Sequence, residues 1–325
     1  MFNYRRFTIY LIIAYIVMLG IYSYIVLNHK MLYMNAEYPM WVNVKNRMNS
    51  SIANGFNFIY IGDSRAKAGF IPSKFDTDAV NSINLALGGS TPIEGYYTLR
   101  NYLSHNHTPE YLLMSYAPFH ISQQDSYWQR TAKFNFLEDK DYSDIQEVSL
   151  VLNDKTTLGV KDKYLNYKML VGKYLTEFAK GIFQQRWLSN NHVLKYLETS
   201  KGHYYFGKNL EATGLNSEAK TTSFKPSKLI SYYLEKTIKL AKENRIKVFW
   251  YTMPFNESSF NATPATFRKE YNQFIENLQD KYGITVLNSL YHLKNTKFSD
   301  PSHLYMGINE VTKDIKIKFH NKLNP

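Results

Sequence analysis

A serine that follows an apolar run is the first residue of this sequence that could do chemistry. Residues 57–61 are apolar enough to form a buried strand, and Gly62, Asp63 and Ser64 follow them in a turn. A serine at the start of the next helix has an exposed hydroxyl and a backbone N–H that is free to donate. Such a hydroxyl is a nucleophile only when a base lies beside it; otherwise the serine simply caps the helix.

An acid and an imidazole near the C-terminus could supply that base. Asp300 and His303 stand three residues apart in a turn before the last expected helix. At this spacing the carboxylate can hold one ring nitrogen of the histidine while the other faces outward. The alternative is an aspartate that caps the turn and a histidine on the surface. Covalent catalysis requires that Ser64 and His303, 239 residues apart, meet at one edge of a sheet.

Two glycines follow the second expected strand, residues 82–87. Gly88 and Gly89 have no side chain, so their backbone N–H groups can come close to a ligand, as an oxyanion hole requires. The alternative is a turn that needs a positive φ. The two glycines therefore mark a second candidate part of the same site.

The elements that must position these residues alternate between strands and helices. Apolar runs predict strands at 57–61, 82–87, 111–115, 246–251 and 284–287, and helical spacing predicts helices at 92–101, 226–244, 264–281 and 307–322. This alternation predicts an α/β fold in which helices flank a parallel sheet. Residues 120–225 do not follow it and are expected to form an insertion, with helices near 143–153 and 160–186.

The N-terminus predicts a membrane anchor. Phe7–Leu27 is 21 residues long without a formal charge, enough for a helix across a bilayer about 30 Å thick. Arg5 and Arg6 before it favour an N-terminus inside the cytoplasm and a body outside the cytoplasmic membrane. A cleavable signal peptide is the alternative, with its nearest small-residue site at Ala36. The expected organisation is residues 1–30 as tip and anchor, 31–55 as connector and 56–325 as the domain.

Composition excludes several classes of protein. With 44% hydrophobic and 16% aromatic residues, the 325-residue chain has ample material for a core, which excludes a disordered or collagen-like chain. The absence of cysteine excludes a disulfide framework, a thiolate nucleophile and a cysteine metal site. The net charge is +12, but the charges are scattered, so we expect a basic surface and no nucleic-acid site. No metal and no cofactor are expected.

In their order along the chain, these motifs resemble those of the SGNH (GDSL-like) hydrolase family. The first, second and fifth sequence blocks of that family find a counterpart here. The matching residues are Gly62-Asp63-Ser64, Gly88 or Gly89, and Asp300-x-x-His303. The resemblance covers residues 56–119 and 226–325 and leaves the anchor and the insertion outside it.

The resemblance implies a fold and a set of roles. The fold would be three-layered and flavodoxin-like. Ser64 would be the nucleophile, His303 the general base, and Asp300 its orienting partner. The backbone N–H groups of Ser64 and of Gly88 or Gly89 would donate hydrogen bonds to the oxyanion.

The third block of the family is the point where the sequence departs from it. The family has Gly-x-Asn-Asp after the third strand, whereas residues 115–118 read Ser-Tyr-Ala-Pro. The missing asparagine is an oxyanion donor, and one such donor contributes about 3–4 kcal/mol in a hydrolase. Arg65, Tyr116 and the aromatic cluster around Tyr204 are the candidates to replace it or to bind substrate.

The anchor together with the incomplete third block narrows the resemblance to membrane-anchored acyl-transfer proteins. These include the D-alanyl transfer protein of teichoic acids and the O-acetylation proteins of alginate and bacterial cellulose. The implied activity is serine O-acyl transfer, most simply of acetyl, from an acyl donor to a surface or secreted glycan, beside a multi-pass membrane-bound O-acyltransferase. Two alternatives remain: an esterase with the same triad, and a non-catalytic glycan-binding or scaffold protein. Aromatic residues of the insertion could stack on sugar rings or pack in a core: His120, Tyr127, Trp128, Tyr204 and Tyr205.

Overall fold

The centre of the molecule is a five-stranded sheet in which every pairing is parallel, with the strand order β2-β1-β3-β4-β6. The structure is a computed structural model that describes residues 4–50, 55–123, 127–154, 160–207 and 212–323. The strands of the sheet are β1 (Phe58–Gly62), β2 (Ser82–Asn84), β3 (Tyr111–Ser115), β4 (Lys247–Trp250) and β6 (Thr285–Val286). A small second sheet pairs β5 (Phe255–Asn256) with β7 (His292–Leu293).

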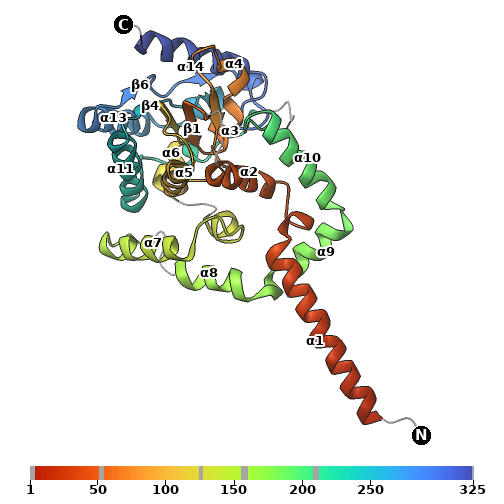
Figure 1. Ribbon diagram of the computed structural model, residues 1–325. Helices are drawn as coiled ribbons and strands as arrows, with labels where there is room; N and C mark the ends of the chain where they lie inside the picture. The colour runs from red at the N-terminus through yellow and green to blue at the C-terminus, as the bar shows by residue number, and fades with distance from the viewer. Residues whose placement is uncertain (1–3, 51–54, 124–126, 155–159, 208–211, 324–325) are drawn as a thin grey trace.

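Each face of the sheet carries its own apolar core. Side chains alternate along β1, so that Ile59 and Ile61 pack on one face and Phe58 and Tyr60 on the other. The first face is covered by α5 (Pro92–His105), α11 (Lys228–Glu243) and α13 (Ala265–Tyr282), and the second by α3 (Ser64–Gly69), α4 (Pro72–Phe75) and α14 (Ile308–Leu323) (Figure 1). The predicted α/β fold with a parallel sheet flanked by helices is confirmed.

The strand order explains where a site can form. The chain runs from β1 outward to β2 and then returns to β3 on the other side of β1. In an open parallel sheet, such a reversal leaves a crevice outside the carboxyl ends of the two strands. Gly62 at the end of β1 is in register with Ser115 at the end of β3. The turns that follow these two residues therefore meet.

Helix α1 (Tyr4–Asn28) projects away from the body of the molecule (Figure 1). It is long and apolar enough to cross a membrane. Its last turn is nevertheless part of the body. Val26 is fully buried, and the hydroxyl of Tyr33 donates a hydrogen bond of 2.6 Å to the carbonyl oxygen of Val26.

Residues 31–55, expected as a connector, contribute a helix to the core. A short 3-10 turn η1 (Lys30–Leu32) is followed by α2 (Tyr38–Asn49), which packs against α5 and α10. Trp41, Val44 and Met48 are buried in the same core as Ile59 of the sheet. Helix α1 is thus joined to the rest of the molecule through packed structure. Residues 51–54 lie outside the described part of the chain.

The insertion is helical, as expected, but in more pieces. The helix expected at 160–186 is divided by a 3-10 turn that contains Gly172, a residue with low helix propensity. The elements are α6 (Pro118–Ser122), the π-helical turn η2 (Tyr127–Ala132), α7 (Asp139–Val151), α8 (Val160–Met169), η4 (Val171–Tyr174), α9 (Leu175–Phe183), α10 (Arg186–Thr199) and η5 (Glu218–Lys220). Two short elements, α12 (Glu257–Ala262) and η6 (Asn295–Lys297), lie in the C-terminal part.

After α10 the insertion returns to the edge of the sheet. The backbone N–H of Asn84 in β2 donates to the carbonyl oxygen of Lys201 at 2.9 Å. Gly202 has φ +92°, and a Cβ there would lie 2.0 Å from the carbonyl oxygen of Asn84. A glycine is therefore required at this close approach, which directs the following residues toward the carboxyl end of the sheet.

His203 gives the fold a predictable dependence on pH. Its side chain is buried, the residue is 2% exposed, and its Nε2–H donates to the carbonyl oxygen of Ala68 at 3.1 Å. Burial lowers the pKa of His203 to about 4. The unfolded chain takes up this proton near pH 6.5 and the folded chain only near pH 4, so the free energy of unfolding falls by about 3 kcal/mol as the pH drops through this window. We expect a falling Tm in a pH series.

The matched variants for this prediction are His203→Gln and His105→Gln. His203→Gln removes the titrating group, so its Tm should depend less steeply on pH between 6.5 and 4. His105 is exposed, and its replacement should leave the wild-type slope unchanged. A wild-type slope in His203→Gln would assign the acid sensitivity to other groups.

Candidate active site

Asp63, rather than Ser64, caps helix α3. Its Oδ1 accepts hydrogen bonds from the backbone N–H groups of Arg65 at 2.9 Å and Ala66 at 3.4 Å. The alternative in which Ser64 caps this helix is therefore wrong. Ser64 is the first residue of this helix and lines the pocket in front of it.

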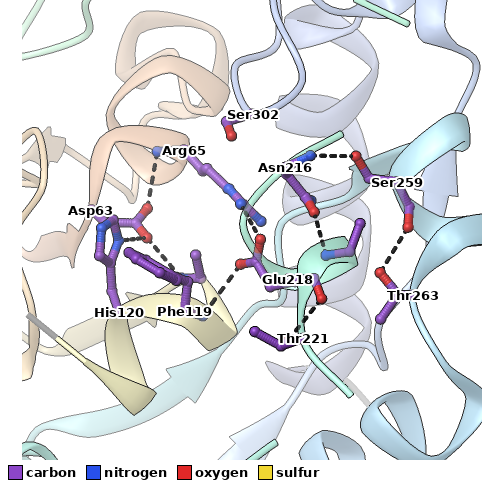
Figure 2. A network of polar contacts seen from close by, with 12 residues as sticks. Asp63, Arg65, Phe119, His120, Asn216, Glu218, Thr221, Ser259, Thr263 and Ser302 are labelled. Atoms are coloured by element: carbon purple, nitrogen blue, oxygen red, sulfur yellow. Dashed lines mark hydrogen bonds and ion pairs between the residues drawn. The ribbon is translucent and has the colours of Figure 1, made fainter. Parts of the chain in front are cut away.

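The other oxygen of Asp63 joins the turn after β1 to the turn after β3. Its Oδ2 accepts from the backbone N–H of Ala117 and from Nδ1–H of His120, both at 2.7 Å (Figure 2). Burial by itself would raise the pKa of Asp63, but the hydrogen bond and charge of His120 hold it below its usual value. The two turns can approach because residue 62 is glycine: a Cβ on Gly62 would lie 2.0 Å from the carbonyl oxygen of Ser115.

Asp300 and His303 form a second acid–imidazole pair. Asp300 Oδ2 accepts from Nδ1–H of His303 at 2.7 Å, and its Oδ1 accepts from the backbone N–H groups of Ser302 and His303 at 2.7 and 2.8 Å. Burial would raise the pKa of Asp300, but the hydrogen bond and charge of His303 hold it below its usual value. Asp300 thus caps the turn and also orients the ring, leaving Nε2 as the hydrogen-bond acceptor.

The insertion supplies the wall behind this histidine. The ring of Phe206 stacks on that of His303, with centroids 4.5 Å apart and planes at 22°. Nε2 of His303 is buried and has no hydrogen-bond partner within the described part of the chain, Ser64 included. An unsatisfied buried nitrogen is uncommon and is typical of sites where a ligand or substrate completes the network.

Ser64 and His303 line one pocket, with a volume of about 190 Å³. Of the other residues expected at the site, Arg65, Gly88 and Gly89 line it as well. The structure therefore brings together residues from the first, second and last candidate motifs. The remaining lining residues come from the N-terminal segment, the turn after β3, the insertion and the turn before α14: Glu37, Ala117, Phe119, His120, Arg130, Phe206, Ser217 and Ser302.

Gly88 and Gly89 differ in whether their backbone conformation requires a glycine. Gly89 has φ +69°, in the left-handed region that favours glycine, so the turn explanation applies to it. Gly88 has no such backbone, and a Cβ there would make an ordinary contact of 3.6 Å with the ring of Phe206. The backbone conformation therefore explains the glycine at position 89 but not the one at position 88.

Two arginines at the pocket are each paired with a glutamate. Arg65 Nη2 lies 2.7 Å from Glu218 Oε2, and Glu218 Oε1 accepts from the backbone N–H of Phe119 at 3.3 Å (Figure 2). Arg130 binds Glu37 through both Nε and Nη2, the latter at 2.9 Å from Oε1. These pairs hold the insertion and the N-terminal segment against the site. The positive charge of Arg65 is thus largely compensated by a buried partner.

Tyr116 does not reach the pocket. It is 2% exposed in the core, and a Cβ on Gly95 would lie 1.9 Å from its hydroxyl, so the tyrosine fills the space that this glycine leaves. The expectation that Tyr116 contributes to the site is corrected: it is a core residue. Tyr204 packs against Tyr196 and Phe206, and of this aromatic cluster Phe206 is the residue that lines the pocket. The side chains of Tyr127 and Trp128 lie outside the described part.

His120 is the main site residue whose role the sequence did not indicate. In the sequence it is only an aromatic residue that could stack on sugar, because no spacing links it to Asp63, 57 residues away. The one usable signal was its position shortly after the third strand, at the place of the missing third block. Arg130 and Glu37 had no signal at all.

Within the described residues, no three His, Asp or Glu side chains form a group that could hold a metal ion. The groups at the pocket include the hydroxyl of Ser64 and two imidazoles, each paired with a carboxylate. Comparison of the sequence with models of protein families and with curated proteins gives no match.

Proposed function

We propose that the chain is a membrane-anchored serine O-acyltransferase that modifies a glycan outside the cytoplasm through an acyl-serine intermediate. One observation carries the proposal: Ser64 and His303, oriented by Asp300, line one pocket at the carboxyl edge of the sheet. An arrangement of nucleophile, imidazole and orienting carboxylate is recognised by its geometry and roles. The multi-pass acyltransferase partner and the glycan acceptor follow from the family resemblance of the motifs.

The proposed reaction has two steps. Ser64 Oγ attacks the carbonyl carbon of the acyl donor while His303 Nε2 takes the serine proton, and the leaving group of the donor then receives this proton. A hydroxyl of the glycan next attacks the acyl-serine, His303 takes the hydroxyl proton, and Ser64 recovers it as the ester forms. Atoms and charges balance in each step without a cofactor.

The size and place of the pocket support a small acyl group delivered at the membrane. A volume of about 190 Å³ is below the roughly 300–1,000 Å³ of sites for drug-sized ligands. Glu37 lines the pocket only nine residues after Asn28, the end of α1, so at about 3.3–3.6 Å per residue the two lie no more than about 32 Å apart.

The packing around residues 29–34 favours a retained anchor over a cleaved signal peptide. The side-chain amide of Asn190, itself buried, donates to the carbonyl oxygens of Met31 and Met34, both at 2.9 Å. Cleavage near Ala36 would remove both acceptors and leave a buried amide unsatisfied, which costs about 1–3 kcal/mol.

His120 is our candidate for the missing oxyanion donor. His120 lines the pocket, its Nδ1–H is held by Asp63, and an imidazolium ring donates from both nitrogens. His120→Asn keeps a donor for Asp63 but removes the group at the Nε2 position. We expect kcat for an activated acyl ester to fall about 10²–10³-fold, the effect of removing one oxyanion donor, with little change in KM or Tm.

His120→Gln is the matched control, since its amide nitrogen reaches the position of Nε2. It should recover part of the lost kcat. Wild-type kcat in a correctly folded His120→Asn protein would show that His120 is not an oxyanion donor.

One assay separates acyl transfer from the two alternatives. The purified protein is incubated with an activated acetyl ester, with and without a glycan acceptor, and Ser64 is trapped with a fluorophosphonate. Acetylated glycan with a Ser64 adduct supports the proposal. Hydrolysis that is indifferent to the acceptor indicates an esterase, and a folded protein without adduct or turnover indicates a scaffold.

A further inference from the structure

A basic and apolar surface lies beside the C-terminal part of α1. It is formed by residues 168–188, which run from the end of α8 through η4 and α9 into α10. Its exposed apolar side chains are Met169, Leu170, Leu175, Ile182, Phe183 and Leu188. Its basic residues are Lys173, Lys180 and Arg186, together with Lys168, which pairs with Asp139 at 2.7 Å. Phe183 is 90% exposed, which is rare for so large an apolar residue in water.

This surface is held against the candidate membrane helix. The hydroxyl of Tyr22 in α1 donates to the carbonyl oxygen of Val171 at 3.0 Å. The rings of Tyr22 and Phe178 meet edge to face, with centroids 5.3 Å apart. Figure 1 shows α8 and α9 reaching the upper end of α1, on the side of the body from which the helix leaves. The depth of Tyr22 in a bilayer therefore sets the depth of the surface.

That depth follows from the length of α1. The uncharged stretch begins at Phe7, directly after two arginines. Tyr22 is fifteen residues further along, which is about 22 Å of helix, whereas the hydrocarbon core of a bilayer is about 30 Å thick. Tilting the helix would only bring Tyr22 closer to the inner boundary. The residues that pack on Tyr22 thus lie at or below the outer edge of the hydrocarbon.

We infer that residues 168–188 form an interfacial surface that inserts its apolar side chains into the outer leaflet of the membrane that α1 spans. An apolar face with basic residues around it is typical of segments that lie in the membrane interface. The lysines and the arginine would reach anionic headgroups, and their aliphatic stems would lie along the apolar region. The inference uses the part of the proposed function that places α1 in a bilayer and does not depend on catalysis.

The absence of cysteine makes a direct test straightforward. Phe183→Cys, Ile12→Cys and Ile317→Cys each provide a single labelling site for an environment-sensitive fluorophore in the full-length protein. The labelled proteins are reconstituted into vesicles of phosphatidylcholine and phosphatidylglycerol, some containing lipids with a nitroxide on the acyl chain. Ile317 is the matched control, because it is an apolar residue, 48% exposed, on α14 at the opposite end of the molecule from α1.

We expect the label at position 183 to be blue-shifted and quenched by the nitroxide lipids, as at position 12, while the label at 317 is neither. Position 183 behaving like 317, with position 12 quenched, would overturn the inference and leave the anchor intact. No quenching at position 12 would overturn both the anchor and the inference. Protection of position 183 in native membranes but not in pure lipid would identify a protein partner and overturn lipid insertion.

Discussion

Ser64→Ala is expected to lower the turnover of an activated acyl ester by about 10⁴-fold or more, to the level of the uncatalysed reaction plus binding effects. Without the hydroxyl no acyl-serine can form, and neither the acceptor nor water can then receive the acyl group from the protein. The measurements are the initial rate of ester turnover, the mass of the intact protein after incubation with the ester, and its labelling by a fluorophosphonate.

The fold should tolerate this change. Asp63 caps the helix, so removing the Ser64 hydroxyl takes away no cap, and we expect a change in the free energy of unfolding within about 0.5 kcal/mol. Ser302→Ala is the matched control, because Ser302 lines the same pocket but has no role in the proposed reaction. Equal loss in both variants would indicate a damaged pocket, and full activity of Ser64→Ala would exclude the acyl-serine intermediate.

The sheet and its helices could be predicted because their apolar patterns are local. The run at 57–61 is apolar without alternation, as a strand covered on both faces must be, and β1 is buried along its whole length. The helix at 226–244 has one apolar face, and α11 buries it against the sheet. These apolar patterns predict a strand or a helix without information about which segment packs against it.

Helix α2 could not be predicted in the same way. It packs on α10, about 150 residues away in sequence, and its apolar residues stand among polar ones of similar number. Its burial depends on contact with α5 and on the insertion folding back over the domain, and nothing between residues 31 and 55 indicates either. Because the insertion is long and divided into several short helices, the sequence does not show which of them packs on α2.

The candidate site was predictable to the extent that its residues lie in turns between strands and helices. Ser64 follows β1 and His303 precedes α14, and both turns were expected at the carboxyl edge of a parallel sheet. The groups that hold them are set by tertiary contacts. Glu218 reaches Arg65 from 153 residues away and Glu37 reaches Arg130 from 93 residues away, so no local pattern records either pair.

The structure holds two acid–imidazole pairs at one pocket, and the variant Asp300→Asn distinguishes their roles. We expect Asp300→Asn to lower kcat by about 10⁴-fold. The asparagine can still accept the backbone hydrogen bonds of the turn, but its amide group faces Nδ1 of His303 and favours the wrong tautomer, so Nε2 can no longer take the serine proton. His303→Ala should cause a loss of similar size. Both are measured as steady-state turnover of the activated ester.

A double variant tests whether His303 acts through Ser64. If His303 acts only by activating Ser64, turnover in Ser64→Ala/His303→Ala should equal that in Ser64→Ala, since residues that act as one unit are not additive. His120→Asn provides the comparison, because it should lose only about 10²–10³-fold if His120 stabilises charge rather than removing the proton. A larger loss in His120→Asn than in His303→Ala would mean that the pair formed by Asp63 and His120 is the base, and that the pair formed by Asp300 and His303 is not.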